Sequence, residues 1–265
     1  MTPFTAKEGT TMMRNARHLS AAALLIAAIL FAVATPAVQA DPSKPLAGYT
    51  VVIDPGHQLG NKNFPAQINR RVDAGNGHTK ACNTTGTATN SWDTGKAVPE
   101  ATVNWNVAIK VKKQLELQGA TVIMTRTANS NALWGPCINV RGMTGNGKAD
   151  LLLSIHADGA SASSNGFHVL IVGQGKAQHA SSLAFAKTMR GSLQASGFKI
   201  ANYVRWGIRS SNDYATLNLS KKPSIIVEMG NMRNKADALR LTSAAGQTKY
   251  ANGLAAGVKK YLLTH

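Results

Sequence analysis

Two histidines and two glutamates, at positions 57, 156, 100 and 228, are of the residue types that bind metal ions and transfer protons. His57, His156 and Glu228 each end a short apolar run, which is typical of a buried strand in an α/β sheet. The runs span residues 51–57, 151–156 and 224–228. Because open α/β sheets bind ligands beyond the carboxyl ends of their strands, we expect these three side chains to share one site.

Catalytic zinc needs three protein ligands and an open position for water, and imidazole and carboxylate groups are common donors. His57 and His156 would supply two imidazoles. Glu100 would supply a carboxylate at the start of a predicted helix, where the helix dipole favours negative charge. Each residue taken alone has a simpler interpretation, as a hydrogen-bonded structural histidine or a favourable first-turn acid. The prediction of zinc-dependent hydrolysis depends on the three residues converging.

Glu228 is a candidate proton-transfer group, because it ends an otherwise apolar strand. Partial burial would raise the pKa of its carboxyl group and suit proton transfer near neutrality. The alternative is a structural ion pair between Glu228 and Arg233 or a loop lysine. After residue 40 the chain has only three glutamates, Glu100, Glu116 and Glu228. Two of them occupy the positions that the site requires.

The surrounding pattern predicts a single α/β domain, with strands alternating with helices that cover both faces of the sheet. The clearest helix begins after Pro99 and repeats apolar residues every fourth position until it stops at Gly119. Further strands are expected over 120–125 and 167–172, and further helices near 139–145, 180–196 and 248–263. Residues 197–222 are expected to be irregular, apart from a short apolar piece at 215–219.

The N-terminal segment has the features of a secretory signal peptide. Basic residues precede an apolar stretch over 21–34, and Val38 and Ala40 fit a signal-peptidase site with Asp41 as the first mature residue. The apolar stretch is short for a membrane span, although an uncleaved N-terminal anchor is the alternative. We therefore predict a signal peptide over 1–40 and one catalytic domain over 41–265. The domain would act outside the cytoplasm, secreted or periplasmic, at the cell envelope.

The chain is strongly basic, with a formal net charge of +17. The Lys and Arg residues are spread along the chain and form no basic stripe with interleaved aromatics, so nucleic acid is not the expected partner. Distributed positive charge would attract an anionic cell-envelope polymer, or it would simply maintain solubility. The predicted protein is a monomer, with no stable insertion in the membrane after the signal is cleaved.

The two cysteines, Cys82 and Cys137, are predicted to form one disulfide bond, because an exported protein folds in an oxidising compartment. Zinc ligation by the pair is the alternative, but neither belongs to a Cys-x-x-Cys motif. Cys82 lies within a long polar stretch, residues 58–98. We interpret this stretch as an insert that the disulfide attaches to the rest of the domain.

Four blocks of the sequence resemble the zinc-dependent N-acetylmuramoyl-L-alanine amidases of the amidase-3 type. The first is Val-Val-Ile-Asp-Pro-Gly-His over 51–57, and the second runs from Glu100 to Arg126. The third runs from Arg141 to Asp158, and the fourth from Pro223 to Asn234. The blocks occur in the family's order and span nearly all of the chain after residue 40.

This resemblance implies a single zinc ion held by His57, Glu100 and His156, with Glu228 as the catalytic glutamate. It also implies a mixed, mostly parallel sheet of about six strands flanked by helices. The implied activity is peptidoglycan hydrolysis at the amide between the lactyl group of N-acetylmuramic acid and L-alanine of the stem peptide. The interval of 43 residues between His57 and Glu100 is wider than the family pattern. The insert would shape the substrate groove, gate it or brace the fold.

Two other functions remain as alternatives to the amidase. A different zinc-dependent cell-wall peptidase is one, although the chain lacks the His-Glu-x-x-His motif of many zinc peptidases. A non-catalytic wall-binding or regulatory domain is the other, and the complete set of His57, Glu100, His156 and Glu228 argues against it. The expected partner in each case is peptidoglycan or a muropeptide.

Overall fold

The computed structural model describes residues 41–265. Its main sheet has six strands in the order β4-β1-β5-β8-β6-β7. Neighbouring strands are parallel except for β6 and β8, which are antiparallel, so the predicted mixed and mostly parallel sheet is confirmed. The strands are β1 (Thr50–Pro55), β4 (Thr121–Met124), β5 (Leu151–Asp158), β6 (His168–Val172), β7 (Ile208–Ser211) and β8 (Ser224–Asn231). The predicted signal peptide, residues 1–40, lies outside the described residues.

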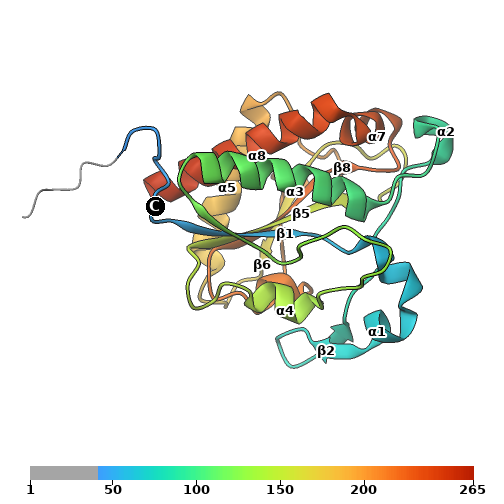
Figure 1. Cartoon of the computed structure of the whole chain (residues 1–265), viewed down its shortest axis with the longest axis horizontal. Coiled ribbons are helices and arrows are strands. Elements are labelled where there is room, and N and C mark those ends of the chain that lie inside the picture. The colour runs from blue at the N-terminus through green and yellow to red at the C-terminus, as the bar shows by residue number, and fades with distance from the viewer. Residues whose placement is uncertain (1–40) are drawn as a thin grey trace, which may run out of the picture. The chain divides into compact units, whose positions relative to one another are not determined.

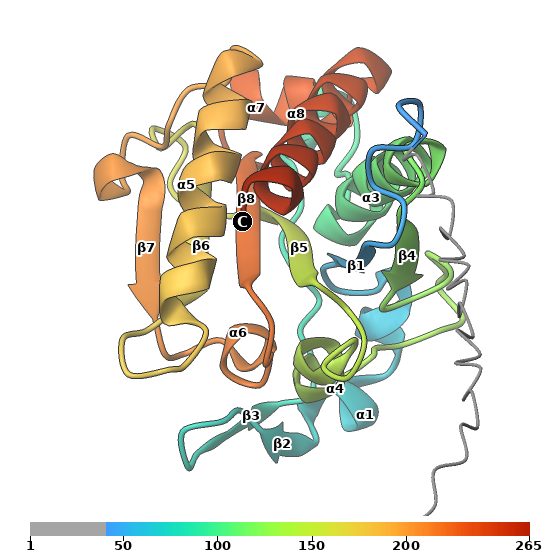
Figure 2. The same ribbon diagram turned by 90° about the vertical axis from the view of Figure 1, so that its left-hand side faces the viewer.

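Helices cover both faces of the sheet, as Figures 1 and 2 show. One face carries α3 (Glu100–Leu117), α5 (His179–Ala195) and α8 (Ala244–Thr264), and the other carries α4 (Ile138–Met143) and α6 (Ala215–Asn218). Helix α7 (Lys235–Thr242) follows β8 and packs against α8. Because side chains alternate along a strand, Leu151, Leu153 and Ile155 pack in the larger core under α3, α5 and α8. Leu152 faces the opposite side.

Helix α3 confirms the four-residue repeat read from the sequence. Val103, Val107, Val111 and Leu115 are fully buried against the sheet. The helix ends at Leu117, and Gly119 follows with a φ of +94°, a left-handed conformation that glycine adopts without strain. This helix therefore presents Glu100, its first residue, at the edge of the sheet where β1 and β5 end.

The part of the chain after residue 196 is more ordered than expected. Residues 208–211 form β7, which pairs with β6 as an edge strand, and the short 3₁₀ helix η2 (Arg205–Gly207) precedes it. The sequence of β7 hides this strand, because an edge strand with one apolar residue has no clear alternating pattern. Helix α8 begins at Ala244, four residues earlier than expected, where the Ser243 hydroxyl accepts a hydrogen bond from the Gly246 amide.

The insert over 58–98 folds into short elements beside the sheet. They are η1 (Leu59–Asn63), α1 (Pro65–Asn69), the hairpin strands β2 (Arg71–Asp73) and β3 (Thr79–Ala81), and α2 (Ser91–Thr94). The predicted disulfide between Cys82 and Cys137 is present. It attaches the chain just after β3 to the residue before α4, so the end of the insert has a fixed position beside the sheet.

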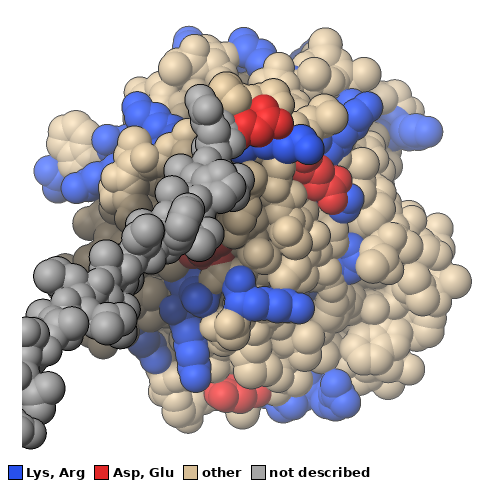
Figure 3. Space-filling view, turned by 60° about the vertical axis from the view of Figure 1, so that its left-hand side comes forward, with Lys and Arg blue, Asp and Glu red and all other residues tan. Residues whose placement is uncertain are grey.

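The surface agrees with the spread of basic residues in the sequence. On the face drawn in Figure 3, Lys and Arg side chains lie scattered among neutral residues, and acidic side chains are few. Within residues 41–265, no helix combines the length and hydrophobicity that a membrane crossing needs.

Candidate metal centre

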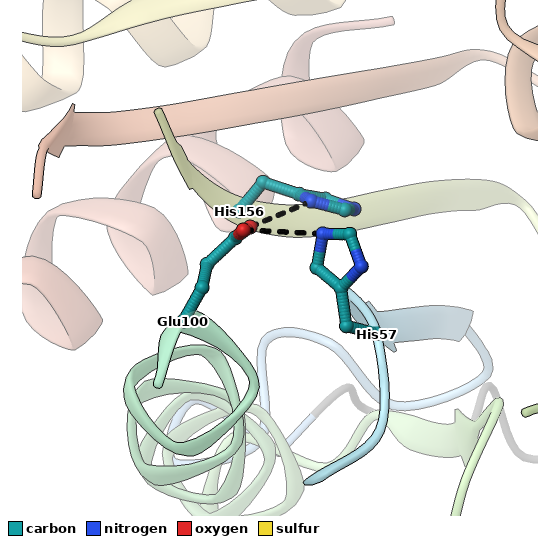
Figure 4. Close-up of side chains that lie close together, drawn as sticks. All are labelled: His57, Glu100 and His156. Atoms are coloured by element: carbon teal, nitrogen blue, oxygen red, sulfur yellow. Dashed lines mark hydrogen bonds and ion pairs between the residues drawn. The ribbon is translucent and has the colours of Figure 1, made fainter. Parts of the chain in front are cut away.

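The structure brings His57, Glu100 and His156 together, with one candidate ligand atom from each within 4.8 Å of the others. Figure 4 shows the two imidazoles beside each other, with the Glu100 carboxylate facing a nitrogen of each. His57 Nε2 lies 3.2 Å from Glu100 Oε2, and His156 Nδ1 lies 3.0 Å from Glu100 Oε1. The predicted convergence of His57, Glu100 and His156 is therefore present, although β5 continues to Asp158 and β8 to Asn231, beyond the strand ends expected at His156 and Glu228.

The electrostatics of Glu100 fit a metal ligand. The residue is only 4% exposed, and burial alone would raise the pKa of its carboxyl group. The imidazoles of His57 and His156 outweigh burial and hold this pKa well below its usual range. The site thus offers one carboxylate oxygen and two imidazole nitrogens close together. Zinc and similar divalent metals prefer this set of donors.

The proton on His57 is placed by a backbone carbonyl. His57 Nδ1 lies 3.0 Å from the Thr84 carbonyl oxygen, which can only accept, so Nδ1 carries the proton. In the neutral ring, the Nε2 atom that faces Glu100 would then have its lone pair available for a metal. The Asn61 side-chain amide donates to the same carbonyl at 2.7 Å and fixes its position. Thr84 belongs to the insert and lies two residues after Cys82, so the insert braces a candidate ligand.

The backbone around His57 is also held in an unusual conformation. His57 has a φ of +59°, which side-chain-bearing residues rarely adopt, and the Arg141 guanidinium donates to its carbonyl oxygen at 2.7 Å. The preceding residue must be glycine, since a Cβ atom at position 56 would lie 2.2 Å from the His156 ring. The tight approach of the two histidines thus depends on Gly56 and on Arg141.

Glu228 lies beside this cluster. It pairs with His156 across β5 and β8, and paired residues point to the same face of a sheet. Burial raises the pKa of Glu228 well above its usual range, and the nearby carboxylates of Glu100 and Asp158 raise it further. The alternative of an ion pair is not seen among residues 41–265, since Arg233 donates instead to the Asn90 side chain.

The three clustered residues and Glu228 line one cavity of about 320 Å³. The insert forms part of its wall through Lys80, which makes an ion pair of 2.8 Å with Asp213. The insert therefore shapes the cavity as well as bracing His57. Asp54 and Asp158 flank the histidines in the sequence, but Asp54 binds Arg141, and Asp158 accepts a hydrogen bond from Tyr203. Neither one orients an imidazole.

A third histidine, His168, is buried beside the site. It pairs with Glu228 across β6 and β8 and is 3% exposed. No partner among the described residues reaches its Nδ1 atom. Burial lowers the pKa of His168 to about 4, although Asp158 nearby opposes this shift.

This buried histidine predicts a loss of stability in weak acid. Below about pH 6.5, His168 binds a proton in the unfolded chain, whereas in the native protein it stays neutral down to about pH 4. The free energy of unfolding therefore decreases as the pH is lowered across that interval. Urea unfolding at about pH 7.5 and about pH 5 should therefore show a smaller acid-induced loss in His168→Gln than in the wild type. An equal loss in both proteins would contradict this origin.

Comparison with known proteins places the site in a family. Residues 51–260 match the family described as N-acetylmuramoyl-L-alanine amidase, and the chain belongs to this family. It is an N-acetylmuramoyl-L-alanine amidase, a peptidoglycan hydrolase that acts on the cell wall at the cell envelope.

Among its relatives, the chain is similar to the N-acetylmuramoyl-L-alanine amidase Rv3717 of Mycobacterium tuberculosis. The two are 41% identical over 246 residues, which cover 91% of this chain and 98% of the relative. The fold matches the crystal structure of the amidase Ami1 from Mycobacterium smegmatis with a TM-score of 0.77 and 35% identity, covering 83% of this chain and 99% of that one. The apo form of Ami1 from Mycobacterium abscessus matches with a TM-score of 0.75 and 40% identity, covering 82% and 99%.

Proposed function

We propose that this amidase is an exported, zinc-dependent enzyme that hydrolyses the amide between the lactyl group of N-acetylmuramic acid and L-alanine of the stem peptide. The observation that carries the proposal is the buried Glu100 carboxylate between two imidazoles, with Glu228 in the same cavity. His57, Glu100 and His156 would hold the metal. A zinc ion bound there supplies Lewis-acid polarisation of the scissile carbonyl and makes the attacking water more acidic.

Glu228 is the proposed proton-transfer group. Because the pKa of Glu228 is raised toward neutral pH, its carboxyl group can both accept and release a proton under those conditions. Glu228 would accept the proton of the attacking water and deliver it to the departing nitrogen of L-alanine. Glu228 pairs with His156 across β5 and β8, so its carboxyl group lies beside the candidate ligands. It is not itself one of the proposed ligands.

Residues 1–40 are proposed to direct export and to be removed before Asp41. The disulfide between Cys82 and Cys137 supports export, because such bonds persist in oxidising compartments. We propose that the remaining domain acts as a monomer on peptidoglycan or muropeptides, with no nucleic-acid partner and no stable membrane insertion.

Metal removal tests the proposed reaction. Purified residues 41–265 should release intact stem peptide from a muramoyl-peptide, chelator should abolish this release, and added zinc should restore it. Mass analysis of the products identifies the bond, because only amidase cleavage frees the amino group of L-alanine from the muramic acid. Cleavage within the peptide would replace the proposed bond, and chelator-resistant release would contradict the role of the metal.

A further inference from the structure

A second hollow adjoins the metal cavity on the side of β6 and β7. Asp158 lines both cavities, and the Tyr203 hydroxyl, which donates to Asp158 at 2.9 Å, stands on the side of the second hollow. The rest of its polar wall consists of His168, Arg205, Arg209 and Ser210. A molecule bound at Glu228 could therefore extend past Asp158 into this hollow without leaving the protein surface.

The strand register places these groups on the face of the sheet that carries the site. His156 pairs with Glu228, and Glu228 pairs with His168, so the three side chains form a row across β5, β8 and β6. Leu170, two residues after His168, pairs with Arg209 on β7. Since alternate residues share a face, Arg209 also points to the side of Glu228.

The hollow has donors that the protein itself leaves without partners. Among residues 41–265, no carboxylate forms an ion pair with Arg205 or Arg209. Arg205 lies over the exposed Trp206 ring, 5.6 Å from its centroid, a contact that leaves the guanidinium edge free to donate. The buried Nδ1 atom of His168 has no partner in the described part of the chain. Buried polar atoms are rarely left in this state, and His168 lies in the wall of the hollow.

We propose that this hollow is a subsite for a carboxylate on the peptide half of the substrate, an inference that rests on the proposed reaction. The N-acetylated sugar half is uncharged near the scissile bond, whereas the stem peptide carries carboxylates. A guanidinium binds a carboxylate through two parallel hydrogen bonds, and two unpaired guanidinium groups line this wall. Arg209 is the principal residue, because its strand position joins it to the row of Glu228 and His168.

The test compares two muramoyl-tripeptides that differ only in their peptide groups, one with free carboxylates and one with the same groups as amides. Wild-type enzyme should show a higher kcat/KM for the carboxylate form. Arg209→Gln should reduce this preference about ten- to a hundredfold, the range expected for a lost hydrogen bond to a charged group, and mainly through KM. Arg209→Lys should restore part of it, because the charge returns without the paired donors.

Lys260→Gln is the matched control, because it removes one positive charge from an exposed position on α8, on the opposite side of the sheet. It should keep the wild-type preference. A wild-type enzyme that cleaves both substrates equally, or an Arg209→Gln variant with unchanged preference, would overturn the subsite. If the wild type releases stem peptide from neither substrate, the proposed reaction itself fails, and the subsite fails with it.

Discussion

Replacing Glu228 with glutamine should lower kcat on a muramoyl-peptide by about 10²–10⁴-fold, the usual contribution of a positioned acid–base group. The amide keeps the size of the side chain but cannot accept a proton from water. Because Glu228 lies outside the proposed ligand set, the variant should bind the same amount of zinc per chain as the wild type. Turnover by mass analysis and metal content of the purified protein are the two measurements.

The Glu228→Gln substitution should also affect the stability of the native protein. A carboxyl group with a raised pKa destabilises the native protein when it ionises, so Glu228→Gln should have a urea midpoint at or above that of the wild type near neutral pH. Glu116→Gln is the matched control, since Glu116 lies on the surface of α3 in a pair with Lys112. That variant should retain full turnover. Wild-type turnover in Glu228→Gln would remove this residue from the mechanism.

The candidate site could be predicted because its residues lie near the ends of regular elements. His57 follows β1, and His156 and Glu228 lie in the C-terminal halves of β5 and β8, so these strands bring all three residues toward one edge of the sheet. Glu100 begins a helix whose four-residue repeat is plain in the sequence. The order of neighbouring strands in the sheet could not be predicted from the sequence. The pairing of His168 with Glu228 needs an antiparallel β6, and the apolar run over 167–172 is compatible with either strand direction.

The groups that hold the site in place are harder to predict, because they act through backbone atoms. The Thr84 carbonyl orients His57, yet any residue has a carbonyl, and its position depends on the folded insert. Arg141 reaches the His57 carbonyl across 84 residues of sequence. Strand β7 was missed for a related reason, since its pairing with β6 is specified by neighbours and not by its own composition.

Asp54 and Arg141 form the pair whose loss should destabilise the domain most. Asp54 is fully buried and Arg141 is 2% exposed, and Arg141 Nη1 donates to Asp54 Oδ1 at 2.5 Å. Thr125 and Ser154 donate to the same carboxylate. Burial alone would raise the pKa of Asp54, but Arg141 and these hydroxyls outweigh it and hold the pKa below its usual value.

Asp54→Asn should therefore lower the free energy of unfolding by about 3–5 kcal/mol, because it leaves the buried guanidinium without its counter-charge. This is a large part of the stability of a typical domain, about 5–15 kcal/mol. Urea unfolding of the metal-free protein at neutral pH measures the loss. Asp150→Asn is the control, because Asp150 is exposed and its carboxylate accepts from the Thr50 amide at the surface. A loss below about 1 kcal/mol in Asp54→Asn would contradict the role of the pair.

The double variant Asp54→Leu with Arg141→Met separates stability from site geometry. Apolar residues of similar volume remove the uncompensated charge, so most of the lost stability should return. The His57 carbonyl would still lack the Arg141 donor that holds its left-handed backbone. Zinc affinity should then stay lower by about 10–100-fold, the usual cost of removing a group that orients a ligand. Recovery of both properties would show that Arg141 serves the fold alone; recovery of stability without affinity would make it a positioning residue for His57.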